Sequence, residues 1–385
     1  MSEFRRRLSA HAILTPQGLL RGGVLSFDET GTLTDIAEPG MAALDGCRDV
    51  EFFSGILLPG MVNAHCHLEL SYLKGAVPRR SGFAGFADAI AVERHRCTPA
   101  ERVEAAAYRD AKMYSEGISV VGDICNGSST FGIKEKSPIR YHSFVEGFGL
   151  KSSDFSSVHG LAREASQRGL AASVTPHSTY SLQDAPFREL ASTGGRLSVH
   201  FMESVQERDL FLRRGPLYER NRKAGVREDF LRYGSPAGRI VASVPPDTDI
   251  LLVHGTFVVD EEISLLQSHF GSRASWVLCP RSNDYIEGAH PPTERLRKAG
   301  CRVAVGTDSL ASNDSLSLVE ELKAMPEVPL EERLRWATIE GARALGVDDR
   351  FGSFEPGKRP GAVLLGGVDW ERMQLRASAS AIRIL

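Results

Sequence analysis

Short apolar runs recur along the middle of the chain, and segments with the apolar spacing of an amphipathic helix separate them. Two of these segments, residues 99–117 and 156–169, end at glycine, which is a common helix stop. The alternation predicts βα units with parallel strands. The runs number eight, as a (β/α)8 barrel requires, and lie at 56–67, 118–124, 139–147, 171–177, 196–203, 249–255, 274–280 and 301–308.

The two ends of the chain have a different pattern. Residues 1–55 contain short strand-like runs broken by Gly, Pro and Asp, and residues 350–385 show the same punctuation. We therefore predict an α/β fold in which residues 58–349 form a TIM barrel, while residues 1–57 and 350–385 combine into a small β-sandwich domain. Residues 204–248 are rich in Arg and longer than a simple βα connection, and such long connections usually carry function.

The composition limits the classes of function. The 385 residues are 42% hydrophobic, and 46 Lys and Arg residues against 49 Asp and Glu residues give a net charge of −3. This balance offers no electrostatic argument for nucleic acid or an anionic membrane as a partner. No signal peptide and no run of membrane-spanning length is visible, so we expect a cytoplasmic protein. Six scattered cysteines without a CxxC pair predict reduced thiols.

The chemistry-bearing residues gather at the carboxyl ends of the predicted strands. Five of the 11 histidines end or follow a run, and two carboxylates, Glu203 and Asp308, hold matching positions. The active site of a (β/α)8 barrel lies at that face, so residues distant in sequence converge there. The five histidines are His65, His67, His177, His200 and His254.

His65 and His67 are two residues apart on one predicted strand, so both imidazoles point to the same face and can bind one ion. His200 and Asp308 complete a set of three imidazoles and one carboxylate, with a water in the remaining position. This set suits one divalent metal, with Zn²⁺ favoured and Fe²⁺ as the alternative. An HxH step alone more often marks surface or core histidines, but the further polar residues at strand ends argue against that interpretation here.

Glu203 lies three residues after His200, so it can face the substrate instead of the ion and transfer a proton between metal-activated water and a ring nitrogen. His254 can donate a hydrogen bond to the hydroxide or to the oxygen that develops on the substrate. Metal binding lowers the pKa of water to about 7, which makes hydroxide available at neutral pH. The alternative role for Glu203 is to stabilise a helix N-terminus, and both roles can coexist.

Other motifs are incomplete. Residues 352–359 have the spacing of a Walker A loop, but Arg359 stands where Ser or Thr would hold Mg²⁺, and Pro356 stiffens the loop. The HExxH motif, the PCxxC half of the nucleic-acid deaminase signature and the GxSxG elbow are absent.

The segments LLPGMVNAHCHLELS, HFMES, LLVHGT and VAVGTDSLASN resemble the metal-dependent amidohydrolase superfamily, in particular its deaminase and chlorohydrolase branch, over nearly the whole chain. The fourth predicted strand has no lysine that could be carbamylated to bridge two metals, so the resemblance implies a mononuclear site. It also implies catalytic roles for Glu203, His254 and Asp308, the last as acceptor of a proton from water. The implied metal ligands are His65, His67, His200 and Asp308.

Within this branch, residues 175–181 (TPHSTYS) are similar to the segment after strand four of methylthioadenosine and S-adenosylhomocysteine deaminases, which implies that His177 contacts a nucleoside. HCHLELS, CPRSN and GTDSLASN resemble the deaminases of 6-aminodeoxyfutalosine most closely. That resemblance places Glu69, Arg281 and Asn283 in the pocket. The substrate of those enzymes contains a benzoate, with which Arg281, or alternatively Arg79 or Arg80, could pair.

These features lead to three hypotheses. The first is a hydrolytic deaminase that releases ammonia from the 6-amino group of an adenine nucleoside derivative, with 6-aminodeoxyfutalosine favoured over methylthioadenosine or S-adenosylhomocysteine. The second is another aminohydrolase or chlorohydrolase of the same branch, acting on guanine, cytosine or an s-triazine. The third is an inactive, metal-containing scaffold. In the enzyme hypotheses the partner is a small molecule, and the resemblance is compatible with a homodimer.

Overall fold

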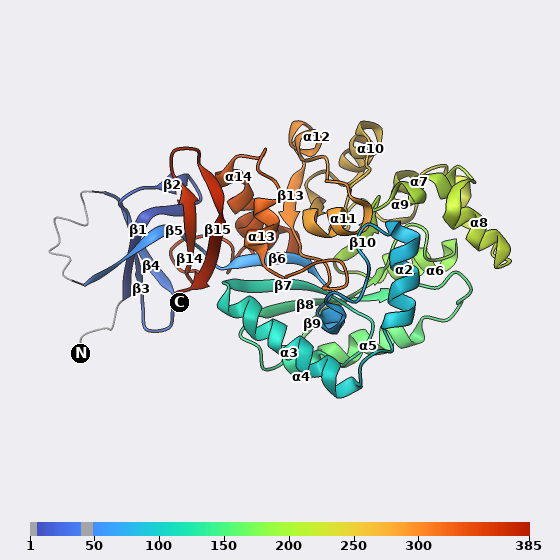
Figure 1. The fold of residues 1–385 in the computed structure, drawn as a ribbon, viewed down its shortest axis with the longest axis horizontal. Coiled ribbons are helices and arrows are strands. Elements are labelled where there is room, and N and C mark those ends of the chain that lie inside the picture. Colours follow the sequence, from blue (N-terminus) through green and yellow to red (C-terminus); the bar gives the residue numbers. More distant parts are fainter. Residues whose placement is uncertain (1–5, 40–48) are drawn as a thin grey trace.

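The computed structural model describes residues 6–39 and 49–385 (Figure 1). Each predicted run contains a parallel strand, and the strands follow one another in chain order in two four-stranded sheets. Isolated parallel bridges between Cys66 and Asp308 and between Ser178 and His200 join the two sheets at both edges. The α/β class and the strand order expected of a (β/α)8 barrel are thus confirmed. The strands are β6 (Met61–Cys66), β7 (Ile118–Cys125), β8 (Arg140–Gly147), β9 (Ala171–Pro176), β10 (Leu197–Phe201), β11 (Ile250–His254), β12 (Ala274–Leu278) and β13 (Arg302–Val305).

These strands are buried on both faces. In β11, Leu251 and Val253 belong to an apolar cluster formed mainly by the parallel strands and closed by α15, whereas Ile250 and Leu252 belong to the larger core. Alternate residues of a strand point to opposite faces, and parallel strands covered on both faces read as continuous apolar runs. This burial explains why the strands were visible in the sequence.

The first predicted run, residues 56–67, contains parts of two strands. β5 (Val50–Leu58) ends before Pro59, and β6 begins at Met61. Gly60 is required between them, because a Cβ atom at this position would lie 1.9 Å from Ser119 Oγ and 2.5 Å from the carbonyl oxygen of Pro360. The chain therefore passes through a tightly packed turn immediately before the strand that carries His65.

Strands from both chain ends form a single seven-stranded sheet, drawn at the left of Figure 1. β14 pairs with β5 in antiparallel fashion, so the C-terminal strands lie directly beside a strand from the N-terminal part of the chain. The seven-stranded sheet packs against a small apolar core that contains Leu8, Phe27, Leu57 and Phe354. The remaining strands of this sheet are β1 (Arg6–Thr15), β2 (Gly18–Leu20), β3 (Val24–Phe27), β4 (Leu33–Ala37), β14 (Val363–Asp369) and β15 (Gln374–Arg383).

Helices lie between the parallel strands. The predicted helix at 99–117 is α3 (Pro99–Ser115), whose N-terminus is capped by Thr98 with the reciprocal bond from Glu101, and the predicted helix at 156–169 is α5 (Ser156–Gln167). The other helices are α2 (Gly82–Glu93), α4 (Phe131–Lys134), α6 (Asp184–Ala191), α7 (Val205–Phe211), α8 (Gly215–Lys223), α9 (Pro236–Ser243), α10 (Asp260–Phe270), α11 (Pro280–Glu287), α12 (Thr293–Lys298), α13 (Leu318–Lys323), α14 (Leu330–Arg335) and α15 (Gly341–Leu345). Short 3-10 segments are η1 (Leu68–Leu73), η2 (Asp229–Tyr233) and η3 (Gly271–Arg273), and η4 (Trp336–Glu340) is a π-helix.

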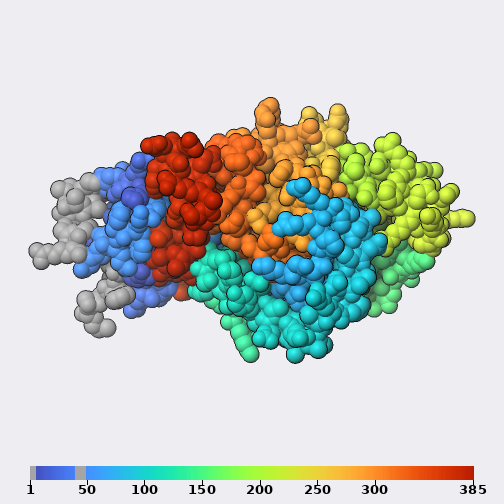
Figure 2. All heavy atoms as spheres, in the orientation of Figure 1, coloured from blue at the N-terminus to red at the C-terminus, as the bar shows by residue number. Residues whose placement is uncertain are grey.

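The long connection at 204–248 is folded. It contains α7, α8, η2 and α9, and its buried side chains Leu210, Leu217 and Phe230 form a separate apolar cluster. Phe83 of α2 packs against this cluster. In Figure 2 the blue segment that contains α2 accordingly lies beside the yellow-green segment of α7 and α8. The connection and α2 together cover one side of the strand ends.

Two further sequence predictions can be compared with the described residues. Five cysteines in this part of the chain are free thiols, as predicted, whereas Cys47 lies outside it. No helix within residues 6–39 and 49–385 is long and apolar enough to cross a membrane.

Candidate metal centre and active site

Four side chains meet at the carboxyl ends of β6, β10 and β13. His67 Nε2 lies 3.2 Å from His65 Nε2 and 3.4 Å from His200 Nε2. Asp308 Oδ1 lies 3.3 Å from His67 Nε2 and 3.6 Å from His65 Nε2. All four side chains are buried, and their ligand atoms lie within 4.8 Å of one another. The structure therefore brings together the set that the sequence predicted as metal ligands.

The spacing of these atoms fits a metal ion. Around a tetrahedral ion with bonds of about 2.0–2.1 Å, neighbouring ligand atoms are about 3.3 Å apart. The pKa of His67 is lowered to about 3, mainly by burial, so this imidazole is neutral and has a lone pair. His200 Nδ1 is 3.0 Å from the carbonyl oxygen of His177, a contact that places the proton on Nδ1 and directs the Nε2 lone pair into the cluster.

Hydrogen bonds also orient the carboxylate. Ser282 Oγ and Ser312 Oγ donate to Asp308 Oδ2 at 2.7 and 2.6 Å, which leaves Oδ1 facing the imidazoles. The backbone N–H of Asp308 donates to the carbonyl oxygen of His65 at 3.1 Å, so the loop after β13 is tied to β6. The donor chemistry, three imidazole nitrogens and one carboxylate oxygen, is that of a divalent transition-metal site.

Glu203 lies beside this cluster but outside it. Its Oε1 is 3.7 Å from His254 Nε2. The pKa of Glu203 is raised well above its ordinary value, first by burial and then by the negative charge of Asp308. α7 begins after Glu203, and Ser204, not Glu203, caps it by accepting the N–H of Gln206. The position of the carboxylate thus favours the proton-transfer role over the helix-stabilising one.

His254 is held by Asn283. The amide nitrogen of Asn283 lies 3.0 Å from His254 Nδ1, and both side chains are buried. The pKa of His254 is lowered to about 3, mainly by burial, so the ring is neutral. Asn283 is not among the residues that line the neighbouring cavity. The structure shows Asn283 in contact with a predicted catalytic histidine, and its contact with substrate stays a prediction.

The backbone at the site is strained. Met202, His254 and Asp308 have φ angles of 48°, 75° and 56°, in the left-handed region that non-glycine residues rarely adopt. Met202 N donates to the buried carboxylate of Glu207 at 2.5 Å, which helps to hold this turn. Each of these residues lies within three residues of the end of its strand, where the backbone leaves the sheet.

A cavity of about 810 Å³ opens at the cluster. His67, His200, Glu203 and Asp308 line its buried end. Two predicted substrate contacts also line it: Glu69, and His177, whose ring stacks on that of His200 at a centroid distance of 4.5 Å. His177 Nδ1 is buried and has no hydrogen-bond partner within the described part of the chain, so it is available to a ligand.

Sequence reasoning missed Glu146, the penultimate residue of β8, which also lines the cavity. Asn126 connects it to Glu69: its Nδ2 donates to Glu146 Oε1 at 2.9 Å and to Glu69 Oε1 at 3.0 Å. Burial raises the pKa of both carboxyl groups to about 7. The signal was present in the sequence, because Glu146 ends a predicted strand as the site histidines do.

The arginines predicted to meet a substrate carboxylate have other partners, and none of them lines the cavity. Arg281 donates to Asn313 Oδ1 at 3.1 Å and to Asp314 Oδ2 at 3.0 Å. Arg79 also pairs with Asp314, and Arg80 pairs with Asp284 at 3.0 Å. Asp314 lies in the loop after β13 and Asp284 lies in α11. The strand pattern does not describe how these acids pack against the arginines, which is why the sequence did not reveal the pairs.

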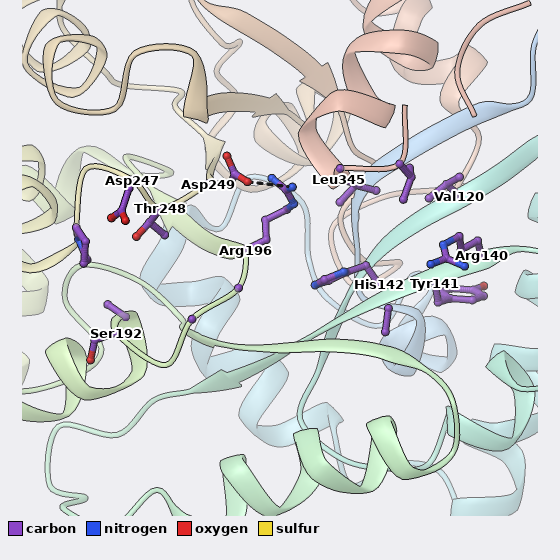
Figure 3. A pocket seen from close by; sticks show the side chains of 17 residues that line it. Val120, Arg140, Tyr141, His142, Ser192, Arg196, Asp247, Thr248, Asp249 and Leu345 are labelled. Carbon is purple, nitrogen blue, oxygen red and sulfur yellow. Dashed lines mark ion pairs between the residues drawn. The ribbon is translucent and has the colours of Figure 1, made fainter. Parts of the chain in front are cut away.

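A second cavity, of about 640 Å³, lies at the opposite, amino ends of the strands (Figure 3). It is lined by His142 near the start of β8 and by Arg196 and Asp249, which precede β10 and β11 and form an ion pair at 3.2 Å. None of the predicted site residues lies in it. The catalytic face of this fold is the other one.

Three imidazoles and a carboxylate at the carboxyl ends of parallel strands define a metal-dependent hydrolase site. Residues 56–379 match the model of the amidohydrolase family, and the chain belongs to this family. It is 27% identical over 332 residues to an adenosine deaminase of Helicobacter pylori, covering 82% of this chain and 80% of the relative. It is 26% identical over 370 residues to a 5-methylthioadenosine/S-adenosylhomocysteine deaminase of Halobacterium salinarum, covering 89% and 80%.

The fold is also similar to a solved structure. The crystal structure of Helicobacter pylori aminofutalosine deaminase in complex with methylthio-coformycin superposes with a TM-score of 0.84 at 23% identity, covering 99% of this chain and 100% of that one. At this identity the likeness establishes the shared fold. The resemblance noted in the sequence is confirmed at the level of the family by the match over residues 56–379.

Proposed function

We propose that the chain is a hydrolytic deaminase that releases ammonia from the 6-amino group of an adenine nucleoside derivative. The observation that carries this proposal is the buried carboxyl group of Glu203, at the end of a cavity and next to a cluster of three imidazoles and one carboxylate. The names of the sequence relatives and of the structural neighbour, all deaminases, support the same chemistry. The favoured substrate is 6-aminodeoxyfutalosine, with methylthioadenosine and S-adenosylhomocysteine as alternatives.

His65, His67, His200 and Asp308 would hold one divalent ion, Zn²⁺ in the first place and Fe²⁺ as the alternative. When bound, such an ion supplies Lewis acidity and makes hydroxide available near neutral pH. Asp308 Oδ1, which receives no serine hydroxyl, can accept a proton at the reacting centre.

Glu203 provides the proton that the reaction requires. Burial and the negative charge of Asp308 raise the pKa of Glu203 above its ordinary value, which favours the protonated carboxyl group that can donate to the ring nitrogen adjacent to the amino-bearing carbon. His254, with its proton on Nε2, can donate to the oxygen that develops at that carbon. Glu69 and His177 are placed to bind the rest of the nucleoside. The buried position of these groups excludes bulk water and strengthens their interactions.

Ammonia release from purified, zinc-loaded protein tests the proposal. The panel is 6-aminodeoxyfutalosine, methylthioadenosine, S-adenosylhomocysteine, adenosine, guanine and cytosine, with chloride release from a chloro-s-triazine measured in parallel. We expect the highest kcat/KM with an adenine nucleoside derivative. A preference for guanine, cytosine or the triazine would replace the proposal by the corresponding activity of the same branch, and a metal-loaded protein inactive on all of them would refute it.

A further inference from the structure

The charged side chains that line the 810 Å³ cavity are separated by sign. Its acidic residues, Glu69, Glu146, Glu203 and Asp308, all surround the histidine cluster at the inner end. Its cationic residues come instead from outer segments: the end of α2, the start of α3, the loop after β8, and α8. They are Arg94, Arg102, Lys151 and Arg220, and three of the four are exposed.

The cations at the outer end differ in how far they are already paired. Arg220 forms an ion pair with Asp88 at 3.2 Å. Arg94, Arg102 and Lys151 form no ion pair with any carboxylate of residues 6–39 and 49–385. Most other arginines near this face, such as Arg281, are paired with acids. Cations without an acidic partner at a cavity mouth are free to bind an anion.

Arg94, through its backbone, and Arg102, through its side chain, both contact Tyr72. The Tyr72 hydroxyl donates to the carbonyl oxygen of Arg94 at 3.1 Å, and the Arg102 guanidinium lies over the Tyr72 ring at 5.0 Å from its centroid. Arg102 Nε donates to the carbonyl oxygen of Cys97 at 3.1 Å, which fixes the guanidinium and leaves its two terminal nitrogens without a partner in the described chain. A planar guanidinium held in this way suits bidentate binding of a carboxylate.

Between the acidic and the cationic ends the cavity is apolar. Phe86 and Ile90 of α2 line one side, and Leu210 and Leu217 of the 204–248 connection also contribute. Such a lining suits a non-polar or aromatic group. A ligand that fills the whole cavity therefore has a basic heterocycle at one end, an apolar middle and an anion at the other end.

We propose that Arg94 and Arg102, assisted by Lys151, form a carboxylate subsite at the cavity mouth, and that they select substrates with a carboxylate remote from the ring that is deaminated. This inference rests on the proposed deaminase function for its choice of substrates. It assigns carboxylate recognition to residues other than Arg281, Arg79 and Arg80. Both an aryl carboxylate and an amino-acid carboxylate have the required chemistry.

The test compares each carboxylate substrate with its neutral carboxamide. In the wild type at low ionic strength, we expect kcat/KM for 6-aminodeoxyfutalosine to exceed that for its carboxamide at least tenfold, and the ratio to shrink in 0.5 M salt. The Arg94→Met/Arg102→Met variant should lower the ratio to about one through KM, with little change in kcat. The matched control is Arg96→Met, because Arg96 is exposed, pairs with Glu93 and does not line the cavity; it should keep the wild-type ratio.

The same measurement with S-adenosylhomocysteine and its carboxamide distinguishes an aryl carboxylate from an amino-acid carboxylate as the preferred group. Equal kcat/KM for acid and amide in the wild type, or an unchanged ratio in the double variant, would overturn the subsite. If the protein deaminates none of these nucleosides, the proposed function fails, but the subsite can still be tested by calorimetric binding of the acid and amide forms to the wild type and the double variant. A tenfold preference of the wild type for the acid that the double variant loses supports the subsite. Equal affinities for acid and amide refute it.

Discussion

Asn283 Nδ2 lies 3.0 Å from Nδ1 of His254, and the opposite nitrogen of that imidazole lies 3.7 Å from Glu203 Oε1. Because an amide nitrogen can only donate, Nδ1 accepts and the imidazole proton is on Nε2. Asn283 thus sets which nitrogen of His254 donates toward the cavity. In the proposed reaction, Asn283 is a positioning residue that acts through His254.

Replacing Asn283 by Leu should therefore lower kcat without removing the metal. Leucine has a similar size but no donor, so His254 would lose the contact that fixes its proton and its orientation. We expect kcat to fall about 10- to 100-fold, the magnitude seen when partners of functional histidines are removed, with metal content measured by plasma emission unchanged. Unaltered kcat would show that His254 is oriented without Asn283.

The Glu203→Gln variant isolates proton transfer from binding. Glutamine keeps the shape of the side chain but has no transferable carboxyl proton. Turnover should fall about 10²- to 10⁴-fold, the usual contribution of general acid–base catalysis. Metal content and melting temperature should stay near those of the wild type, since Glu203 is not among the clustered ligand atoms. A variant with wild-type turnover would remove the proton-transfer role.

Removal of the divalent metal should abolish activity and lower the melting temperature. A ligand that binds only the folded state stabilises that state. In addition, the ring nitrogens of His65, His67 and His200 lie 3.2–3.4 Å apart, so their lone pairs repel one another when no ion is bound. Dialysis against a chelator, metal analysis and calorimetry measure these effects, and added Zn²⁺ should reverse them. Full activity at undetectable metal content would contradict the assignment of this cluster.

A buried ion pair supports the segment that follows His67. Lys134 Nζ is 2.6 Å from Asp123 Oδ2, both side chains are inaccessible to solvent, and Asp123 Oδ1 accepts the N–H of Leu68 at 2.7 Å. Lys134→Met leaves a buried carboxylate without its partner, so we expect urea denaturation to show a loss of about 3–5 kcal/mol.

The Asp123→Asn/Lys134→Met double variant is the control for this pair. Asparagine can still accept the Leu68 N–H, and no unpaired charge remains, so the double variant should recover part of the lost stability. A single variant within about 1 kcal/mol of the wild type would mean that the pair contributes no more than a surface salt bridge.

His142 lines the cavity of Figure 3 at the amino ends of the strands. From its pKa we predict that the protein loses folding stability when the pH falls below neutral. Its pKa is lowered to about 4, first by burial and then by Arg196 and Arg140. Between its unfolded value of about 6.5 and its folded value, only the unfolded chain binds the proton. The contribution of His142 is therefore complete above pH 6.5 and is lost as the pH falls toward 4.

Between pH 7.5 and pH 5 this loss amounts to about 2 kcal/mol. His142 Nε2 lies 2.9 Å from Ser173 Oγ, and the glutamine of His142→Gln should retain this hydrogen bond. The variant should lose about 2 kcal/mol less stability than the wild type over that interval, as measured by urea denaturation. The exposed His95, replaced by Gln, is the matched control and should leave the difference unchanged. An identical pH profile for His142→Gln and the wild type would rule out His142 as its source.

The strands and the metal cluster could be predicted because both follow from local rules. β11 and β12 read as apolar runs since both of their faces are buried, and His65 and His67 share a face by the two-residue period. The strand order expected of a (β/α)8 barrel then predicted that His200 and Asp308 lie at the same place. Roles that depend on loop geometry could not be inferred in this way.

Arg281 illustrates the limit. Its position after β12 was identified, but its guanidinium turns to Asn313 and Asp314, whose loop follows another strand. Asn283 was likewise placed at the catalytic face, and only the packing of α11 shows that it meets His254. Arg94 and Arg102 belong to segments with no strand-end position at all, so nothing in the sequence pattern connected them with the cavity.

The left-handed backbone at His254 and Asp308 has a consequence for protein engineering. Such conformations cost about 1–3 kcal/mol each in non-glycine residues, and glycine would relieve the cost while deleting the functional side chain. A laboratory selection for heat resistance alone would therefore reward glycine at the positions proposed to perform the chemistry. A useful selection has to score turnover together with stability, and gains in thermal tolerance should be sought in the sheet formed by the chain ends.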